Sequence, residues 1–222
     1  MNTPEQLPLA FEHRPSLGGD DYLITTCNSE AVAWLDKWPN WGSPALVIYG
    51  PPGCGKTHLA HVFMASTGAV PLTPALVENA GLPQLLSSVN KCVLDDADKN
   101  FNEESLFHLY NALTSVGGHM LLTAAYPPAQ WNLQLADLVS RLKAAPAVEI
   151  GLPDDILIRA VLAKLFSDRQ LRVEEGVIEY LAIRMQRSLD TARHIVAAID
   201  RQALAAKRNI TLPLVRKVLE ER

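Results

Sequence analysis

The sequence predicts an α/β fold, in which a parallel five-stranded sheet is flanked by helices and is followed by a small all-α domain. Two observations predict the first part. Short apolar runs alternate with helical patterns up to about residue 152, which is typical of a parallel sheet with helices on both faces. A glycine-rich turn also joins the first long apolar run to a helical pattern. After Pro153 the strand-like runs stop, and four amphipathic helical patterns follow one another.

The composition bounds the class of protein. A chain of 222 residues with 48% hydrophobic residues suits one sizeable core plus a small appended domain. The formal net charge of -4 argues against broad DNA binding, so a protein partner is the better expectation. The apolar runs are strand-length and no export signal opens the chain, so we expect a cytoplasmic protein that does not enter a membrane. The three cysteines lack metal-ligand spacing and are expected to be free thiols.

The chain divides into three segments. Residues 1–15 read as an extended tail because prolines interrupt them and no period is present. Residues 16–152 are expected to form the α/β domain and residues 153–222 the helical domain. The expected strands are 46–49, 70–73, 91–94, 120–123 and 147–150. The expected helices are 56–66, 82–88, 102–116 and 134–142 in the first domain, and 154–169, 174–186, 188–207 and 211–221 in the second.

A complete phosphate-binding loop occupies residues 50–57, between an apolar strand and a helix. Its glycines let backbone N–H groups converge on phosphate oxygens, and the following helix adds its positive end. This setting disfavours the alternative of a chance glycine-rich turn. We therefore expect ATP or ADP with Mg²⁺ as cofactors. The expected nucleotide contacts are Gly50, Pro51, Gly53, Cys54, Gly55, Lys56, Thr57 and His58, with the Thr57 hydroxyl also on magnesium.

Two carboxylates follow the buried strand 91–94 and complete this prediction. Asp95 is expected to hold magnesium, directly or through water. Asp96 is expected to orient or deprotonate the attacking water, which makes it a catalytic candidate. The alternative is a solvated acidic turn, which the presence of a phosphate loop in the same predicted sheet disfavours.

Taken together, these segments resemble the DnaA branch of the AAA+ ATPases, which contains the replication initiator DnaA and its shorter relative Hda. The resemblance covers most of residues 6–222 and implies an AAA+ core with a helical lid. Residues 22–24, followed by Asn28 and Ala31, resemble the segment that covers the adenine, which makes Ile24 a cofactor contact. Residues 121–128 resemble the family's sensor strand and double-proline loop, and residues 138–142 its arginine-finger segment. The resemblance implies that Arg141 reaches a nucleotide held by a neighbouring molecule.

Two departures from the family pattern affect the sensors. Ala125 stands where the family often has an aspartate, so we expect slow intrinsic ATP hydrolysis. The second sensor is normally an arginine that opens a lid helix, and Arg187 and Arg193 both compete for it. An ungapped comparison places Asp190 at the expected position. We choose Arg187, because it lies at the opening of the helix.

The two ends of the chain bear on its partners. DnaA continues past its lid into a helix-turn-helix domain, whereas this chain ends near the last lid helix, so no sequence-specific DNA binding is expected. Residues 6–11 resemble the short peptide that docks replication proteins on the DNA polymerase sliding clamp. Its anchors would be Gln6, Leu7, Leu9 and Phe11, filling a hydrophobic groove from an extended backbone. The alternative is a tail strand that packs on its own core.

The resemblance thus implies a nucleotide-binding regulator of chromosomal replication initiation. Bound to the sliding clamp, it would stimulate ATP hydrolysis on DnaA and so inhibit initiation. The sequence leaves open whether the chain also forms a homo-oligomer. The alternative is an AAA+ loader or adaptor that acts on another replication or transcription protein. A stand-alone ATPase is a more distant alternative.

Overall fold

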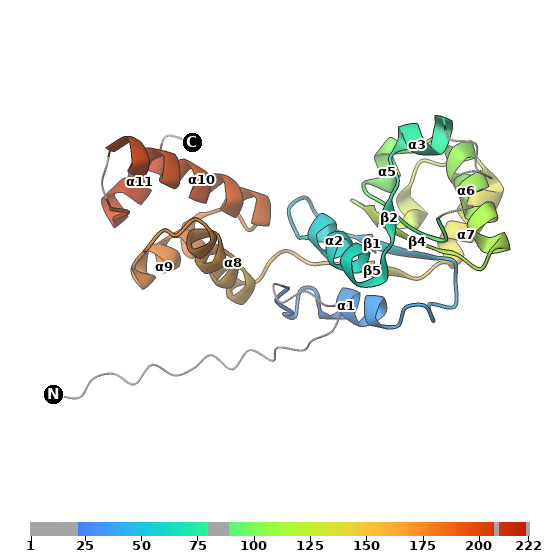
Figure 1. Ribbon diagram of the computed structural model, residues 1–222, viewed down its shortest axis with the longest axis horizontal. Coiled ribbons are helices and arrows are strands. Elements are labelled where there is room, and N and C mark those ends of the chain that lie inside the picture. The colour runs from blue at the N-terminus through green and yellow to red at the C-terminus, as the bar shows by residue number, and fades with distance from the viewer. Residues whose placement is uncertain (1–21, 80–88, 207–208, 221–222) are drawn as a thin grey trace.

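A parallel sheet of five strands forms the centre of the larger domain (Figure 1). The computed structural model describes residues 22–79, 89–206 and 209–220. The strand order is β2-β3-β4-β1-β5, and every neighbouring pair is parallel. This confirms the predicted five-stranded parallel sheet. The strands are β1 (Ala45–Tyr49), β2 (Val70–Pro71), β3 (Lys91–Leu94), β4 (His119–Ala124) and β5 (Ala147–Glu149).

The strand order places the phosphate loop at the centre of one sheet edge. β1 pairs with β4 on one side and β5 on the other, so the loop after β1 lies between the ends of these two strands. β3 pairs with β4 and ends at the same edge. Ligands of open parallel sheets bind at the carboxyl ends of the strands. The fold therefore brings the loop, the two predicted carboxylates and the predicted sensor strand to one crevice.

Helices cover both faces of the sheet, and alternate strand residues pack under them. Leu46 and Ile48 of β1 face a cluster that contains α1 and α2, whereas Ala45 and Val47 face one that contains α6 and α7. This alternation follows from the period of two along a strand. The described helices of this domain are α1 (Ser29–Asp36), α2 (Lys56–Thr67), α3 (Pro74–Asn79), α5 (Ala97–Asn100), α6 (Glu103–Ser115) and α7 (Ala136–Ala144), with a 3₁₀ turn at Pro128–Gln130.

The predicted helices at 56–66 and 102–116 are confirmed. Three described helices, α1, α3 and α5, were not predicted, because each is short and spans eight residues or fewer. The helix α7 begins at Ala136 rather than 134, since the Glu103 carboxylate accepts hydrogen bonds from the N–H groups of Gln134 and Leu135, both at 2.8 Å. Asn102 caps α6 as expected, accepting from two backbone N–H groups. The helix predicted at 82–88 lies outside the described residues.

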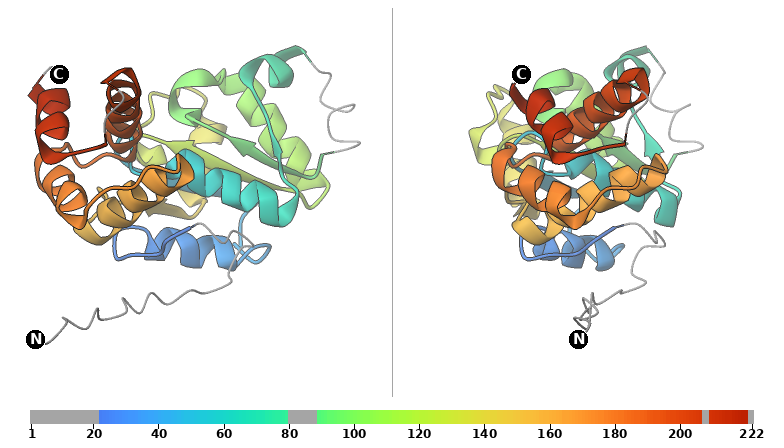
Figure 2. Two further views of the ribbon diagram at one scale, coloured as in Figure 1. Left: turned by 60° about the vertical axis from the view of Figure 1, so that its left-hand side comes forward. Right: turned by 90° about the vertical axis from the view of Figure 1, so that its left-hand side faces the viewer.

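Four helices form the second, smaller unit, as predicted, and Figure 2 shows them at one end of the sheet domain. They enclose a hydrophobic core of their own. Their bounds are α8 (Asp155–Asp168), α9 (Glu175–Arg184), α10 (Leu189–Ala206) and α11 (Leu212–Glu220). Asp154 caps α8 by accepting from the Leu157 N–H at 2.8 Å. Among the described helices, none is long and apolar enough to cross a membrane.

Candidate functional site

The phosphate loop adopts backbone angles that require glycine. Gly53 and Gly55 have φ angles of 71° and 110°, in the region that L side chains rarely adopt. Gly50 has no room for a side chain, because a Cβ atom there would meet the carbonyl oxygen of Ile150 after β5. The predicted role of these glycines, to shape a tight loop between β1 and α2, agrees with this geometry.

Lys56, the first residue of α2, points into the loop rather than into solvent. It is only 9% exposed, and its Nζ donates to the carbonyl oxygens of Gly50 at 2.8 Å and Pro51 at 3.1 Å. Burying an ammonium group without such acceptors would be costly. The loop therefore holds one positive charge in place at the position where the sequence predicts phosphate contact.

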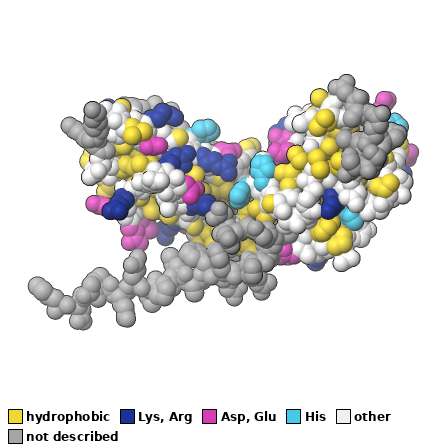
Figure 3. All heavy atoms as spheres, viewed as in Figure 1, with side chains coloured by type: hydrophobic (Ala, Val, Ile, Leu, Met, Phe, Trp, Pro, Cys, Tyr) yellow, Lys and Arg dark blue, Asp and Glu magenta, His cyan; other side chains and the backbone are white. Residues whose placement is uncertain are grey.

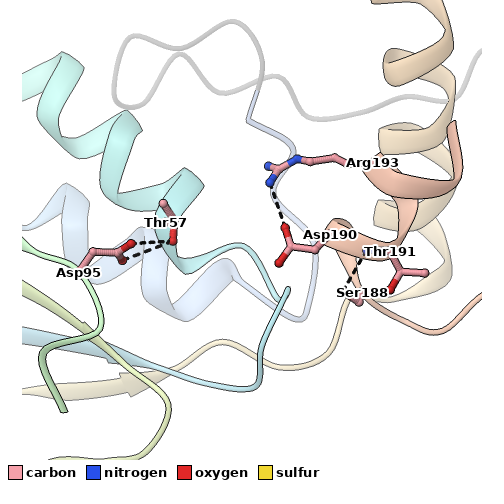
Figure 4. A network of polar contacts seen from close by, with 6 residues as sticks. All are labelled: Thr57, Asp95, Ser188, Asp190, Thr191 and Arg193. Atoms are coloured by element: carbon pink, nitrogen blue, oxygen red, sulfur yellow. Dashed lines mark hydrogen bonds and ion pairs between the residues drawn. The ribbon is translucent and has the colours of Figure 1, made fainter. Parts of the chain in front are cut away.

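The two predicted magnesium ligands lie together. Thr57 Oγ1 donates to the carboxylate of Asp95, with distances of 3.0 Å to Oδ2 and 3.3 Å to Oδ1 (Figure 4). A hydroxyl and a carboxylate are hard oxygen ligands of the kind that Mg²⁺ prefers, alongside water and phosphate oxygens. The described residues offer no cluster of three or more His, Cys, Asp or Glu side chains suited to a metal. The donor set thus fits an ion that arrives with a nucleotide and takes its other ligands from phosphate and water.

Thr123 on β4 was missed by the sequence reasoning and connects both carboxylate residues. Its side chain is fully buried; its hydroxyl donates to Asp95 Oδ1 and accepts from the Asp96 N–H at 2.9 Å. Asp96 itself has a left-handed backbone, with φ of 51°. The sequence carried a signal for this residue, because a hydroxyl inside an otherwise apolar buried strand needs polar partners.

A cavity of about 190 Å³ lies in front of the loop and extends to the lid helix α10. Whole small-molecule sites usually span about 300–1,000 Å³, so this space matches the phosphate portion of a nucleotide rather than all of it. The space-filling view shows the surface hollowed between the lid and the sheet domain (Figure 3). The cavity is lined by Pro52, Gly53, Gly55, Lys56, Thr57, His58, Asp96, Lys99, Ala125, Leu189, Asp190 and Arg193.

The lid contacts the phosphate loop directly. The N–H of Leu189, the first residue of α10, donates to the carbonyl oxygen of Gly53 at 2.8 Å. The side chain of Ser188 lies where a Cβ atom on Gly53 would stand. Since the loop and α10 touch at Gly53, any substitution there disturbs both at once.

The lid brings Arg193, not Arg187, to the cavity. Arg187 Nη2 forms an ion pair with Asp155 Oδ1 at 2.6 Å, and Arg187 does not line the cavity. Arg193 lies on the same face of α10 as Leu189 and Asp190, since residues three and four apart share a helix face, and all three line the cavity. The geometry therefore favours Arg193 over the predicted Arg187, because Arg187 precedes α10 and its side chain turns to α8; the contact of either arginine with a nucleotide stays a prediction.

Residues 22–28 bridge the sheet domain and the lid. Tyr22 stacks on His58 of α2 with ring centroids 5.4 Å apart, and burial raises the pKa of the Tyr22 phenol. Ile24 packs against the cluster under α1 and α2 and does not line the cavity. On the lid side, Thr26 Oγ1 donates to Asp154 Oδ2 at 3.2 Å. The predicted adenine segment thus lies beside the loop helix, with His58 in the cavity wall.

Cys54 lies beneath the loop rather than in the cavity. It is 2% exposed, and burial raises the pKa of its thiol. It packs with the cluster that contains Ile48 and Ile150. Cys54, Cys27 and Cys92 are all free thiols, as predicted. Cys54 therefore supports the loop from below, and its expected nucleotide contact is limited to its backbone.

Arg141 on α7 lies apart from the residues that line the cavity. Its guanidinium carbon is 5.5 Å from the ring centroids of both Phe107 and Tyr110 on α6. Such cation–π contacts hold a guanidinium without neutralising it. The predicted action on a neighbour's nucleotide stays a prediction. The four predicted clamp-binding residues lie outside the described part of the chain.

Comparisons with known proteins bear on the lid and on the whole fold. Residues 155–219 match the family model described as "Hda, lid domain". An uncharacterized protein of Haemophilus influenzae is 28% identical over 189 residues, which span 79% of this chain and 81% of that protein. Among solved structures, domain III of the Thermotoga maritima replication initiation protein DnaA is similar, with a TM-score of 0.78, 18% identity, and coverage of 94% of this chain and 97% of that one.

Two further structures share the fold at lower similarity. AMPPCP-bound DnaA from Aquifex aeolicus has a TM-score of 0.65 and 20% identity, over 88% of this chain and 68% of that one. A mutant of Thermotoga maritima RuvB has a TM-score of 0.68 and 19% identity, over 87% of this chain and 68% of that one. The lid match and the shared architecture confirm the resemblance seen in the sequence: residues 155–219 match the lid domain of Hda, and the chain has the fold of domain III of DnaA.

Proposed function

We propose that this chain is a nucleotide-binding AAA+ regulator of chromosomal replication initiation that, when bound to the DNA polymerase sliding clamp, stimulates ATP hydrolysis on DnaA. The observation that carries the proposal is the separation of two arginines. Arg193 lies at the chain's own phosphate cavity, whereas Arg141 lies on α7, outside that cavity. An arginine outside the chain's own site is available to a nucleotide held by another molecule.

The nucleotide is proposed to be ADP or ATP with Mg²⁺. Lys56 supports the outer phosphates with its buried ammonium group, and Thr57 and Asp95 supply the two protein ligands of the metal. Bound Mg²⁺ would neutralise phosphate charge, and Asp96 is proposed to orient a water molecule. DnaA from Aquifex aeolicus, a protein of the same fold, has been seen with AMPPCP bound.

Intrinsic hydrolysis is proposed to be weak. Ala125 lines the cavity next to Asp96 and Lys99, but its methyl group offers no polar atom to a phosphate or water. Its backbone N–H is already used by Asp98 Oδ2 at 3.0 Å. The site thus supports binding better than turnover, which suits a regulator whose reaction takes place on DnaA.

Arg141 is proposed to act as an arginine finger on DnaA. A guanidinium donates hydrogen bonds in a planar fork that matches two phosphate oxygens. It would stabilise negative charge on the transferred phosphoryl group while water attacks, with ADP and phosphate as the products on DnaA. The guanidinium lies against the Phe107 and Tyr110 rings of α6, and it is proposed to reach the partner's nucleotide from that position.

The tail is proposed to dock on the clamp through Gln6, Leu7, Leu9 and Phe11. Buried anchors of this kind typically cost about 2 kcal/mol or more each when truncated, so replacing Gln6 and Leu7 by alanine should weaken binding well over tenfold. Surface plasmon resonance against immobilised clamp measures this, with ADP titration as the control for an intact core. Equal clamp binding by wild type and variant would contradict the tail assignment.

One experiment separates the proposed function from its alternatives. ATP hydrolysis by DnaA is followed with and without this chain, on DNA that carries the clamp. Stimulation that requires the clamp supports the proposal. A loader or adaptor would bind a different replication or transcription protein and leave DnaA unaffected. A stand-alone ATPase would turn over ATP briskly without any partner. Light scattering in the presence of ADP tests for a homo-oligomer in the same preparation.

A further inference from the structure

The lid places an ion pair of its own inside the phosphate cavity. Arg193 Nη1 lies 3.1 Å from Asp190 Oδ1, and both residues line the cavity together with Lys56 of the loop. The other carboxylate oxygen, Asp190 Oδ2, is 3.5 Å from the position that a Cβ atom on Gly53 would take. Figure 4 shows the pair on the lid side, across from Thr57 and Asp95. A negative group of the protein thus stands next to the loop that is built to receive phosphate.

Asp190 offsets two features that would otherwise attract an anion. It pairs with Arg193, and it lies in the first turn of α10, whose positive end points at the loop. The other charged groups of the cavity wall are Lys56, Lys99 and Asp96. Lys56 and Lys99 belong to the sheet domain, so Arg193 is the cation that the lid contributes to the cavity wall. The ion pair with Asp190 therefore limits how strongly Arg193 can interact with a phosphate.

We propose that Asp190 is a specificity-determining residue, an internal anion that competes with the outermost phosphate of a bound nucleotide for Arg193. The inference rests on the proposed nucleotide-binding function. Each added phosphate brings negative charge toward the guanidinium that Asp190 already engages. The carboxylate therefore opposes a triphosphate more strongly than a diphosphate.

The exposure of the pair sets the size of the effect. The side chains of Arg193 and Asp190 are 52% and 56% exposed, and exposed pairs contribute little in water. A bound nucleotide would displace water from the cavity, and electrostatic interactions strengthen as water leaves. We therefore expect a measurable change in affinity rather than an all-or-none switch.

The test compares Asp190→Asn with wild type. Asparagine keeps the shape of the side chain and removes its charge, which frees Arg193. Affinities for ADP and for AMPPCP, a triphosphate analogue that is not hydrolysed, are measured by calorimetry at fixed Mg²⁺ and salt. We expect AMPPCP to bind about three- to tenfold more tightly and ADP to change less than about twofold. An equal change for both nucleotides, or no change, overturns the inference.

A double variant, which also lacks the Arg193 guanidinium, tests whether Asp190 acts through Arg193. If Asp190 acts by holding Arg193, the gain for AMPPCP disappears when Asp190→Asn is combined with Arg193→Gln. A gain that persists in the double variant would mean simple repulsion of phosphate by Asp190, and the competition would be wrong. Asp190→Ser, which also suits a helix start, repeats the measurement in a second variant that calorimetric melting shows to be folded.

Asp155→Asn is the matched control. Asp155 also forms an exposed pair with a lid arginine, Arg187, but neither residue lines the cavity. We expect no change in the AMPPCP-to-ADP ratio. A gain from Asp155→Asn in place of Asp190→Asn would make Arg187 the phosphate arginine and overturn the inference. Failure of wild type to bind either nucleotide would defeat the proposed function itself, whereas normal binding with an unchanged ratio would defeat only the role of Asp190.

Discussion

The N–H of Leu189 donates to the carbonyl oxygen of Gly53 at 2.8 Å, which joins the first residue of the lid helix α10 to the middle of the phosphate loop. The loop and the lid are thus parts of one site, although they lie far apart in the chain. This contact is the basis of the first prediction.

Gly53→Ala is expected to destabilise the protein and weaken nucleotide binding. Gly53 has a φ of 71°, and a Cβ atom there would meet the Ser188 side chain. The backbone term alone costs about 1–2 kcal/mol. Gly42→Ala is the matched control, because Gly42 has the same φ of 71° and open space around it. Thermal melting and ADP titration are carried out on both variants, and the difference between them reports the contact between Gly53 and the lid. Equal losses of melting temperature and ADP affinity in the two variants would contradict the importance of that contact.

Lys56→Ala is expected to abolish nucleotide binding while the fold stays intact. The Lys56 ammonium is the buried cation of the loop, and the other donors there are backbone N–H groups. Titration with labelled ADP measures the loss. Lys37→Ala serves as the control, since Lys37 is an exposed residue whose Nζ lies over the Trp34 ring, away from the cavity lining. Unchanged ADP affinity in Lys56→Ala would show that the pocket is wrongly assigned.

Thr123→Val is expected to lower the Mg²⁺ dependence of nucleotide binding and to destabilise the fold by about 1–3 kcal/mol, because it leaves the partly buried Asp96 N–H without its acceptor. Thr123→Ser keeps the hydroxyl and should stay close to wild type. The measurements are urea unfolding and ADP affinity with and without Mg²⁺. Identical behaviour of valine and serine variants would mean that the hydroxyl does not organise Asp95 and Asp96.

Arg141→Ala is expected to leave folding, nucleotide binding and clamp binding intact but to eliminate stimulation of ATP hydrolysis on DnaA. Arginine fingers supplied in trans contribute on the order of a thousandfold or more in rate, so the loss should be close to complete. Arg141→Lys should fail as well, because an ammonium group lacks the planar fork. Single-turnover hydrolysis on DnaA is the readout. Substantial stimulation by the alanine variant would refute the finger assignment.

The sequence by itself predicted the features that depend on local pattern. The alternation of apolar runs predicted the parallel sheet, the glycine spacing predicted the phosphate loop, and the Asn102 cap predicted the start of α6. Each of these follows from backbone geometry and burial over a few neighbouring residues. The Thr57 hydroxyl and the Asp95 carboxylate also lie within hydrogen-bond distance of each other, because the carboxyl ends of all strands of a parallel sheet meet at one edge, and their role as magnesium ligands stays a prediction.

Only the tertiary structure decided which distant side chains share the site. Arg187 and Arg193 both lie at the start of a predicted helix, and the packing of α10 on Gly53 turns Arg193 to the cavity and leaves Arg187 to Asp155. The connecting role of Thr123 needed the pairing of β3 with β4, which brings its hydroxyl to both carboxylate residues. A helix rotated by one residue turns its side chains by about 100°, so the residue that reaches a site is set by packing across the chain rather than by local sequence.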